Sequence, residues 1–435
     1  MKKNIGILFL LLFSLQALAE IALTAHEKEV KNYLQATSRE QLKLLESLVN
    51  INSGTLNLQG VKHVGDILEQ ELKQLGFSTR WVSLPSQMNR VGTLIGYHKG
   101  TKGKKLLLIG HLDTVFPANS PFQRFERHGQ LATGPGVIDA KGGDVVIIYA
   151  LKALAKIDAL REATITVVFT GDEEASGKPT SISRKALIEA ATNADVALDF
   201  EWAVSADTVT VARRGIIDWE IKSAGNEAHS SQIFKQAAGY GAIFELTRII
   251  DTFNSELTKE KYLTINPGLI VGGTLIKEDE GVGGNIVFGK ENVIAKMALA
   301  KGDLRFLTEQ QKENAKQKML AIVKRHLPGT TAEIEFKEAI PSMSPRSSNL
   351  KLLQLYNNIS LQLGYAKVSA LDPGARGAGD ISHIASIVPY TLAGLGPVGN
   401  GAHSTQETLQ VNSLSIQAMR AALLIFNLIT NQNSV

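Results

Sequence analysis

Residues 163–174 read ATITVVFTGDEE, and this stretch decides the class of fold that the sequence predicts. Its first eight residues are apolar or β-branched, which is typical of a strand buried in the middle of a sheet. Two adjacent carboxylates, Glu173 and Glu174, follow at once. Burying such a pair costs several kcal/mol unless cations compensate, so the stretch indicates a strand that ends at a cation site. A solvated acidic loop is the alternative, because residues 176–179 read SGKP.

A second run of the same kind lies earlier in the chain. Residues 104–109 (KKLLLI) lead into residues 110–114 (GHLDT), and residues 144–157 between the two runs have the apolar spacing of a helix. A strand, a helix and a strand in this order predict largely parallel strands, whose ligands gather beyond their carboxyl ends. His111 and Glu173 each lie just past such an end, so we expect them at one edge of the sheet.

Three further residues complete a candidate metal site. Asp139 lies in a glycine-rich turn where one carboxylate can reach two metals, although an aspartate there is usually only a turn residue. His403 follows a glycine and an alanine and precedes Ser-Thr-Gln-Glu, and a plain loop histidine is the alternative. Asp113 can hold the nitrogen of His111 that is turned away from the metal. A buried structural histidine capped by an aspartate would have the same sequence.

Taken together, these residues have the composition of a two-zinc amide hydrolase. They offer histidines at the two ends, carboxylates between them, and one carboxylate left over, which we predict to be the general base. The chain has no cysteine, so disulfides and thiolate metal sites are excluded. Any metal must therefore be held by histidine and carboxylate.

Composition and charge exclude several other classes. The 435 residues are 44% hydrophobic, which suits a folded protein of two or three domains. The formal net charge is +4, falls to +2 without Lys2 and Lys3, and is not gathered into basic runs. We therefore expect no nucleic-acid partner and no membrane partner.

Residues 1–19 are predicted to be an export signal. Two lysines precede an apolar run at residues 5–15, and Ala17-Leu18-Ala19 is a small-x-small cleavage site. An uncleaved membrane anchor is the alternative, but the run is shorter than the roughly 20 residues that span a bilayer. We expect cleavage after Ala19, a periplasmic or secreted protein, and no later membrane-spanning segment.

The pattern of expected strands and helices changes near Gly215, and this change predicts an inserted unit at residues 214–341. Its expected strands are residues 216–223, 291–299, 302–307 and 331–336, and its expected helices are residues 237–253 and 308–326. Residues 20–213 and 342–435 then form one catalytic domain. The predicted fold is α/β, with a mostly parallel central sheet flanked by helices and an inserted two-layer α+β domain.

The motifs at residues 110–114, 139–143 and 172–174 resemble those of the aminoacylase and glutamate carboxypeptidase family of two-zinc peptidases. The resemblance covers nearly all of the mature chain. It implies two Zn²⁺ ions, with Co²⁺ or Mn²⁺ as alternatives, and these ligands: His111, Asp139, Glu174, Glu201 and His403. Asp139 would bridge the two ions, and Glu173 would be the general base. Asp199 remains an alternative to Glu201, and a cis peptide is expected after Asp139.

The insert resembles the family's dimerisation domain, which implies a homodimer. His229, in residues 225–230 (GNEAHS), matches a histidine that reaches the partner's active site and donates a hydrogen bond to the oxyanion. An exposed loop histidine is the alternative. The resemblance also implies that Asn292, Arg305 and Gly377 bind substrate, with Arg305 gripping a carboxylate through two hydrogen bonds.

One departure limits what the resemblance implies about substrate. Ile340 stands where glutamate-specific relatives carry a second arginine, so glutamate specificity is in doubt, and Arg346 or Arg376 could supply the missing charge. The predicted function is an exported di-zinc metallopeptidase that removes C-terminal amino acids from short peptides or N-acyl amino acids. An N-acyl amino acid deacylase is the alternative. A third hypothesis is an inactive peptide-binding protein, which would normally have lost Glu173 or a metal ligand.

Overall fold

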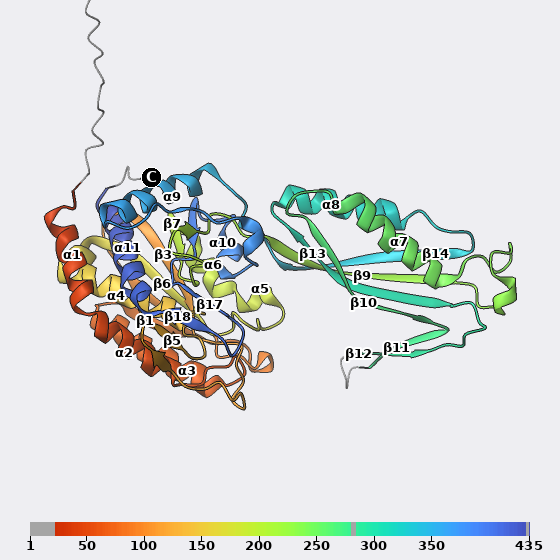
Figure 1. Ribbon diagram of the computed structural model, residues 1–435, viewed down its shortest axis with the longest axis horizontal. Helices are drawn as coiled ribbons and strands as arrows, with labels where there is room; N and C mark the ends of the chain where they lie inside the picture. The colour runs from red at the N-terminus through yellow and green to blue at the C-terminus, as the bar shows by residue number, and fades with distance from the viewer. Residues whose placement is uncertain (1–21, 280–283, 432–434) are drawn as a thin grey trace, which may run out of the picture.

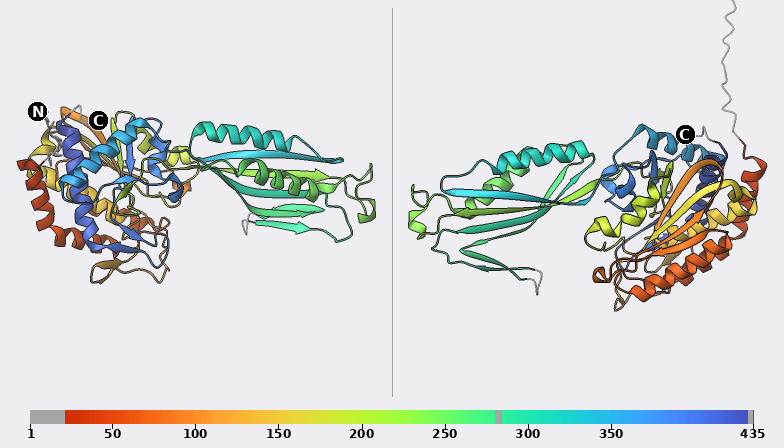
Figure 2. Two further views of the ribbon diagram at one scale, coloured as in Figure 1. Left: turned by 45° about the horizontal axis from the view of Figure 1, so that its top comes forward. Right: turned by 180° about the vertical axis from the view of Figure 1, so that it is seen from behind.

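The computed structural model describes residues 22–279, 284–431 and 435, and it has two lobes joined end to end (Figure 1). The elongated lobe is formed by residues 215–340, and the rounded lobe by the described residues before and after them (Figure 2). The predicted export signal, residues 1–19, lies outside the described residues.

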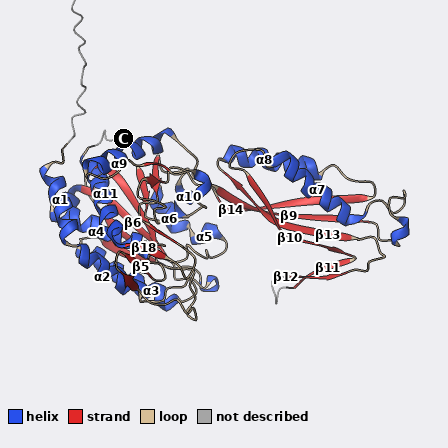
Figure 3. Ribbon diagram, viewed as in Figure 1, coloured by secondary structure: helices blue, strands red, loops and turns tan. Residues whose placement is uncertain are grey.

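The rounded lobe is built around a six-stranded sheet in the order β1-β2-β6-β3-β7-β16 (Figure 3). The strands are β1 Ser78–Val82, β2 Thr93–His98, β3 Lys102–His111, β6 Ala163–Thr170, β7 Val196–Asp199 and β16 Tyr390–Ala393. Neighbouring strands from β6 to β16 run parallel, and β2 runs antiparallel to both β1 and β6. The two apolar runs of the sequence are β3 and β6 at the centre. The prediction of a mostly parallel sheet is therefore confirmed.

Helices cover both faces of this sheet, which explains why its central strands are apolar on both sides. One core lies under six helices: α1 Ala25–Ala36, α2 Ser38–Val49, α3 Leu58–Gln74, α4 Lys141–Lys156, α9 Ser347–Gln362 and α11 Val411–Thr430. The other face is covered by α6 Lys185–Ala191 and α10 Asp380–Ile384, with the short α5 Thr180–Ser183 beside α6. This is the flanking arrangement that the sequence predicts.

The last helix, α11, corrects one expectation about membranes. Its length and composition would allow it to span a bilayer, whereas no segment after residue 19 was expected to do so. In the structure, 72% of the apolar 18-residue stretch of this helix is buried, and the helix packs against α4 and α1. It serves as a core helix of the rounded lobe.

Short elements complete the rounded lobe. Four strands, β17-β18-β5-β4, form a small antiparallel sheet, and β8 pairs with β15. Their bounds are β4 Glu126–His128, β5 Leu131–Thr133, β8 Thr208–Val209, β15 Ser369–Ala370, β17 Gly399–Asn400 and β18 Thr408–Gln410. Single 3₁₀ turns occupy Ser86–Met88, Ala159–Glu162 and Pro373–Ala375.

The elongated lobe is an antiparallel sheet, β10-β13-β9-β14, with two helices on one face. Its elements are β9 Gly215–Gly225, a 3₁₀ turn Ser230–Gln232, α7 Gly241–Leu257, β10 Thr264–Gly273, β13 Met297–Phe306, α8 Glu309–Val323 and β14 Thr330–Ile340. A hairpin of β11 Leu275–Asp279 and β12 Gly284–Phe288 adjoins β10. Alternate residues of β9, namely Ile217, Trp219 and Ile221, are buried under the helices. The period-two pattern read from the sequence thus marks the inner face.

Three predicted elements of the insert were wrong in part. Residues 291–299 and 302–307 were expected to be two strands, but residues 297–306 form the single strand β13. The backbone of residues 292–296 instead bonds to the loop after β9, for example through Ile294 N–H to Ala228 O at 2.8 Å. The helix expected from residue 237 begins only at Gly241. Gly239 and Gly241 have φ angles of 68° and 76°, which lie outside the range of a right-handed helix.

Candidate active site

The candidate site lies at the carboxyl edge of the parallel strands. His111 is the last residue of β3, Glu173 and Glu174 lie in the loop after β6, and Glu201 lies two residues beyond β7. His111 pairs with Thr170 in the ladder between β3 and β6, so these strands end at the same level. Asp139 precedes α4, and His403 lies in the turn between β17 and β18. Five distant segments therefore meet at one edge.

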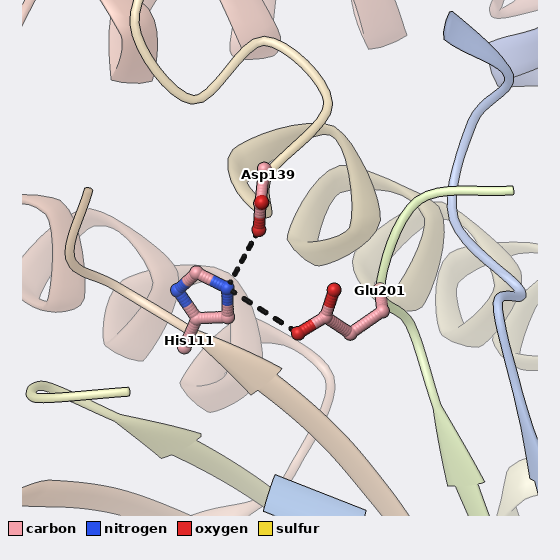
Figure 4. A group of neighbouring side chains, drawn as sticks. All are labelled: His111, Asp139 and Glu201. Atoms are coloured by element: carbon pink, nitrogen blue, oxygen red, sulfur yellow. Dashed lines mark hydrogen bonds and ion pairs between the residues drawn. The ribbon is translucent and has the colours of Figure 1, made fainter. Parts of the chain in front are cut away.

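Two groups of three side chains could each hold a metal ion, and they share one residue. His111, Asp139 and Glu201 form the first group, and Asp139, Glu174 and His403 the second; within each, the ligand atoms lie within 4.8 Å of one another. His111 Nε2 is 3.1 Å from Asp139 Oδ1 and 3.9 Å from Glu201 Oε1 (Figure 4). His403 Nε2 is 3.1 Å from both Asp139 Oδ2 and Glu174 Oε2. Each oxygen of Asp139 thus faces a different group, as a bridging carboxylate requires.

The chemistry of the donors fits a pair of divalent cations. Imidazole nitrogens and carboxylate oxygens are the ligands that zinc takes when thiolates are absent. The buried Oε1 of Glu174 has no hydrogen-bond partner among the described residues, which is costly unless a cation or water meets it. The peptide bond between Asp139 and Ala140 is cis, as the resemblance implies.

The electrostatics of the site also call for positive charge. Hydrogen bonds that His403 donates to the carboxylates of Asp139 and Glu174 raise its pKa to about 11. Burial alone would lower the pKa of His111, but its contacts with Asp113 and Asp139 outweigh burial and raise it well above the usual value. These contacts therefore favour the protonated form of both imidazoles when no metal is bound.

Metal binding is accordingly expected to release protons at pH 7, because a histidine ligand must be neutral. The metal affinity should rise as the pH rises, since fewer protons then have to be displaced from His111 and His403. Calorimetric titration of metal-free protein with Zn²⁺ in buffers of low and high ionisation enthalpy measures this release. Identical apparent enthalpies in the two buffers would contradict it.

Asp113 lies beside Nδ1 of His111, as predicted, and it also holds the loop after β6. His111 Nδ1 lies 3.1 Å from the backbone carbonyl of Asp113 and 3.5 Å from its carboxylate, so the carbonyl is the nearer partner of the ring. The carboxylate accepts the backbone N–H groups of Glu173 and Glu174 at 3.0 and 3.2 Å and the hydroxyl of Thr55 at 2.7 Å. Asp113 thus fixes the loop that carries the two catalytic-site glutamates.

Glu201 and Asp199, the two candidates for one ligand, have different neighbours. Glu201 belongs to the first metal group, whereas Asp199 faces Arg213 at 3.3 Å. Arg376, considered above as a source of charge for the substrate, donates to Glu201 Oε2 and to the Trp202 carbonyl, both at 2.7 Å. It therefore orients Glu201 so that Oε1 faces His111. Arg346, the other candidate, approaches the carbonyl of Val388 at 3.4 Å.

The structure reveals a buried carboxylate that sequence reasoning missed. Glu407 is 1% exposed and accepts the backbone N–H groups of Gly136, Ile138 and Asp139 at 3.1, 2.9 and 3.2 Å. It therefore shapes the turn that presents Asp139. The sequence offered one signal, an acid four residues after His403 at the end of the Ser-Thr-Gln-Glu run, which leads into β18.

A second missed group is a buried ion network behind the glutamate loop. Arg184, 1% exposed, donates to Asp172 Oδ1 at 2.7 Å and to Asp380 Oδ1 at 2.6 Å. Asp172 also accepts from the Gly177 N–H and the Ser183 hydroxyl, at 2.8 and 2.7 Å. The network ties the loop after β6 to the first turn of α10.

Replacing Arg184 by methionine is expected to lower the free energy of unfolding by about 3–5 kcal/mol, because two buried carboxylates lose their cation. Urea unfolding of the metal-loaded protein measures the change. Lys185→Met is the matched control, because the Lys185 side chain is 71% exposed, and it should have little effect. A loss in Arg184→Met no larger than that of the control would contradict the role of the network.

His229 and the predicted substrate residues lie near opposite ends of the insert, with Gly377 in the adjoining loop of the rounded lobe. Arg305 lies near the end of β13 beside the rounded lobe, and a Cβ added to Gly377 would come within 3.7 Å of its Nη1. His229 and Asn292 lie near the far end, where the Ser230 N–H donates to the Asn292 carbonyl at 2.9 Å. Both His229 and Asn292 are exposed. The structure therefore brings Arg305 and Gly377 together and keeps His229 and Asn292 away from the metal groups of the same chain.

Comparisons with known proteins agree with this architecture. The model of "Peptidase family M20/M25/M40" matches residues 107–427. Carboxypeptidase G2 of Pseudomonas sp. (strain RS-16) is 30% identical over 429 residues, which cover 95% of this chain and 96% of that protein. Aminopeptidase PepT of Bacillus cereus ATCC 10987 has a TM-score of 0.73 at 18% identity and covers 90% of this chain and 98% of its own. The Bacillus subtilis YxeP protein, described as a dinuclear metal binding peptidase, has a TM-score of 0.64 at 16% identity, with 91% and 99% covered.

Proposed function

The chain belongs to peptidase family M20/M25/M40, and on this basis we propose that it is an exported di-zinc carboxypeptidase. Its substrates would be short peptides or N-acyl amino acids with a free C-terminal carboxylate. The observation that carries the proposal is Asp139, whose two oxygens each lie 3.1 Å from a different histidine. Glu173 belongs to neither metal group, although its neighbour Glu174 does. One carboxylate is thus left over for proton transfer.

Metal binding, proton transfer and substrate binding are assigned to different residues. His111 and Glu201 would hold one ion, Glu174 and His403 the other, and Asp139 both. Such ions, when bound, polarise the scissile carbonyl and bring the pKa of a water towards about 7. Glu173 takes the proton of the attacking water and returns it to the departing amine. Arg305 would hold the C-terminal carboxylate so that the scissile bond faces the water.

The proposal includes a homodimer, because His229 must come from another chain to reach a metal site. Two features of the insert support this. β10 is an edge strand of its sheet, and an edge offers unpaired backbone groups to a second chain. Apolar side chains are also exposed on α7 and β10, among them Phe244 at 47% and Ile270 at 52%. Export is supported by the sequence of residues 1–19 alone.

The test of the proposed function uses the mature chain from Glu20 onward. Treatment with a chelator should abolish cleavage of dipeptides, and added Zn²⁺ or Co²⁺ should restore it. A panel of dipeptides run beside N-acetyl and N-succinyl amino acids separates the carboxypeptidase from the deacylase. Faster turnover of the acylated amino acids would favour the deacylase. No turnover of any amide after metal reconstitution would favour an inactive binding protein.

A further inference from the structure

The two oxygens of the predicted ligand Glu201 have different neighbours. Oε1 lies 3.9 Å from Nε2 of His111 and is directed at that ring (Figure 4). Oε2 accepts a hydrogen bond from Nη2 of Arg376 at 2.7 Å, a length typical of charge-assisted bonds. Glu201 is only 6% exposed, so its contacts are with protein groups. A metal ion beside His111 would therefore meet Oε1, while Oε2 already has a cation as its partner.

The glutamate of the second metal group differs from Glu201 in this respect. Oε2 of Glu174 lies 3.1 Å from Nε2 of His403, and its Oε1 is buried without a hydrogen-bond partner among the described residues. Glu174 can thus offer both oxygens to one ion, whereas Glu201 has one oxygen to offer. The two metal groups contain the same residue types, but they present different numbers of free oxygens.

Arg376 is held in place by more than its ion pair with Glu201. Its Nη1 donates to the Trp202 carbonyl at 2.7 Å, and its guanidinium carbon lies 4.4 Å from the centroid of the Trp202 ring. The planar fork of an arginine suits this arrangement, because two nitrogens reach two acceptors while the face of the group rests on an aromatic ring. Arg376 is 8% exposed. Since Trp202 directly follows Glu201, the arginine ties the carboxylate to the backbone beside it.

The loop that carries Arg376 is itself anchored to the rounded lobe. The carbonyls of Gly377 and Ala378 accept hydrogen bonds from Nε and Nη2 of Arg213 at 2.7 and 2.8 Å. A Cβ added to Gly379 would lie 2.4 Å from Nη1 of Arg213, so the loop packs directly on this buried arginine. Arg376 therefore cannot move away from Glu201 without the loss of several contacts.

We propose that Arg376 is a positioning residue that limits Glu201 to one oxygen as a metal ligand. This rests on the proposed two-metal function. Partners of this kind orient ligating carboxylates, and their loss typically lowers metal affinity by about 10- to 100-fold. Without Arg376, Glu201 is free to turn and to offer both of its oxygens. Arg376 thereby keeps the number of protein ligands in the first group low, which leaves a position for water beside His111.

The experiment titrates the metal-free mature chain with Co²⁺, whose visible absorption weakens as its coordination number rises. Wild type should bind two ions per chain. Arg376→Met should bind one of them about 10- to 100-fold more weakly, and at saturation the visible absorption should fall, because Glu201 then offers both oxygens. Arg376→Lys should recover only part of the affinity, since it retains the charge but not the fork. Arg161→Met is the matched control, because the Arg161 side chain is 73% exposed, and it should bind both ions like wild type.

Two further variants show whether Arg376 acts through Glu201. In a Glu201→Gln background, Arg376→Met should cause little further loss of affinity, because the carboxylate that it positions is already gone. Trp202→Leu keeps the backbone carbonyl that accepts from Arg376 and removes only the ring. It should weaken the same ion by a smaller factor, about 2- to 5-fold. This variant serves as the test if Arg376→Met does not fold.

Wild-type affinity for both ions in Arg376→Met, or in Trp202→Leu where only that variant folds, would overturn the role of Arg376 while the two-metal proposal stands. A loss at the ion that Glu174→Gln also loses would overturn it too, because Glu174 belongs to the second group. A weaker ion with unchanged absorption would overturn the limit to one oxygen. If wild type binds neither Co²⁺ nor Zn²⁺, the two-metal proposal fails, and the role of Arg376 fails with it.

Discussion

Replacing Glu173 by glutamine is expected to lower kcat by about 10³-fold, within the range attributed to general acid–base catalysis, while both metal ions stay bound. Glu173 belongs to neither metal group, and its backbone N–H is fixed by Asp113 at 3.0 Å. Burial, and then the charge of Glu201, raise the pKa of its carboxyl well above the usual range. A carboxylate in such a place has a high affinity for a proton, as a general base needs. Glutamine keeps the shape and removes that capacity.

Metal content, measured by mass spectrometry alongside the kinetics, decides how the two glutamates divide their roles. Glu174→Gln is the matched variant one residue away, and it should lose the ion of the second group because Glu174 lies 3.1 Å from His403. The assignments would have to be exchanged if Glu173→Gln lost metal while Glu174→Gln kept both ions. Full activity in Glu173→Gln would exclude it as the base.

Replacing His229 by alanine is expected to lower kcat by about 10²- to 10³-fold, the effect of losing one donor to an oxyanion. The metal content and the fold should not change, because His229 is exposed and its ring hydrogen-bonds, within the described part of the chain, to Ser231. Steady-state kinetics beside metal analysis measures both. His128→Ala is a matched control, since the His128 side chain is 69% exposed and lies on β4 of the rounded lobe. Equal activity of the His229 variant and this control would show that His229 is a surface residue with no role in catalysis.

Mixing two inactive variants tests whether His229 acts across a dimer. After subunit exchange, a dimer of one Glu173→Gln chain and one His229→Ala chain contains one intact site, because the His229→Ala chain supplies Glu173 and its partner supplies His229. With random pairing in a symmetric dimer, about a quarter of the wild-type activity should return. No recovery under conditions where the subunits are shown to exchange would exclude the transfer.

The features of the fold and of the candidate site that depend on local sequence patterns could be predicted from the sequence. The apolar runs of β3 and β6 and the alternation in β9 are visible in the chain itself, so the parallel sheet and the insert followed from them. His111, Asp139, Glu174, Glu201 and His403 were linked by the resemblance, and the structure brings them into two adjoining groups. The carboxylate of Asp139 between two histidines is a geometric fact that residue order alone could not supply.

The remaining features depend on contacts between distant segments. Glu407 and Arg184 act by hydrogen bonding to backbone or carboxylates far away in the chain, and these partners cannot be read from the sequence around them. The hairpin of β11 and β12 was missed because its strands are only partly apolar and lie largely exposed. The contact of Asp113 with the His111 ring could be predicted because the two residues are close in sequence, but the hydrogen bonds of its carboxylate to the loop after β6 could not.

The position of α11 has a consequence for biogenesis. This helix follows the other helices and strands of the rounded lobe in the chain, and its Leu423 and Leu424 are fully buried in the core that it shares with α1 and α4. A nascent chain, or one still threading through a translocation pore, lacks this part of the core until residues 411–430 have emerged. The rounded lobe therefore completes its folding only once these residues are available, and stable metal loading has to wait for the same moment.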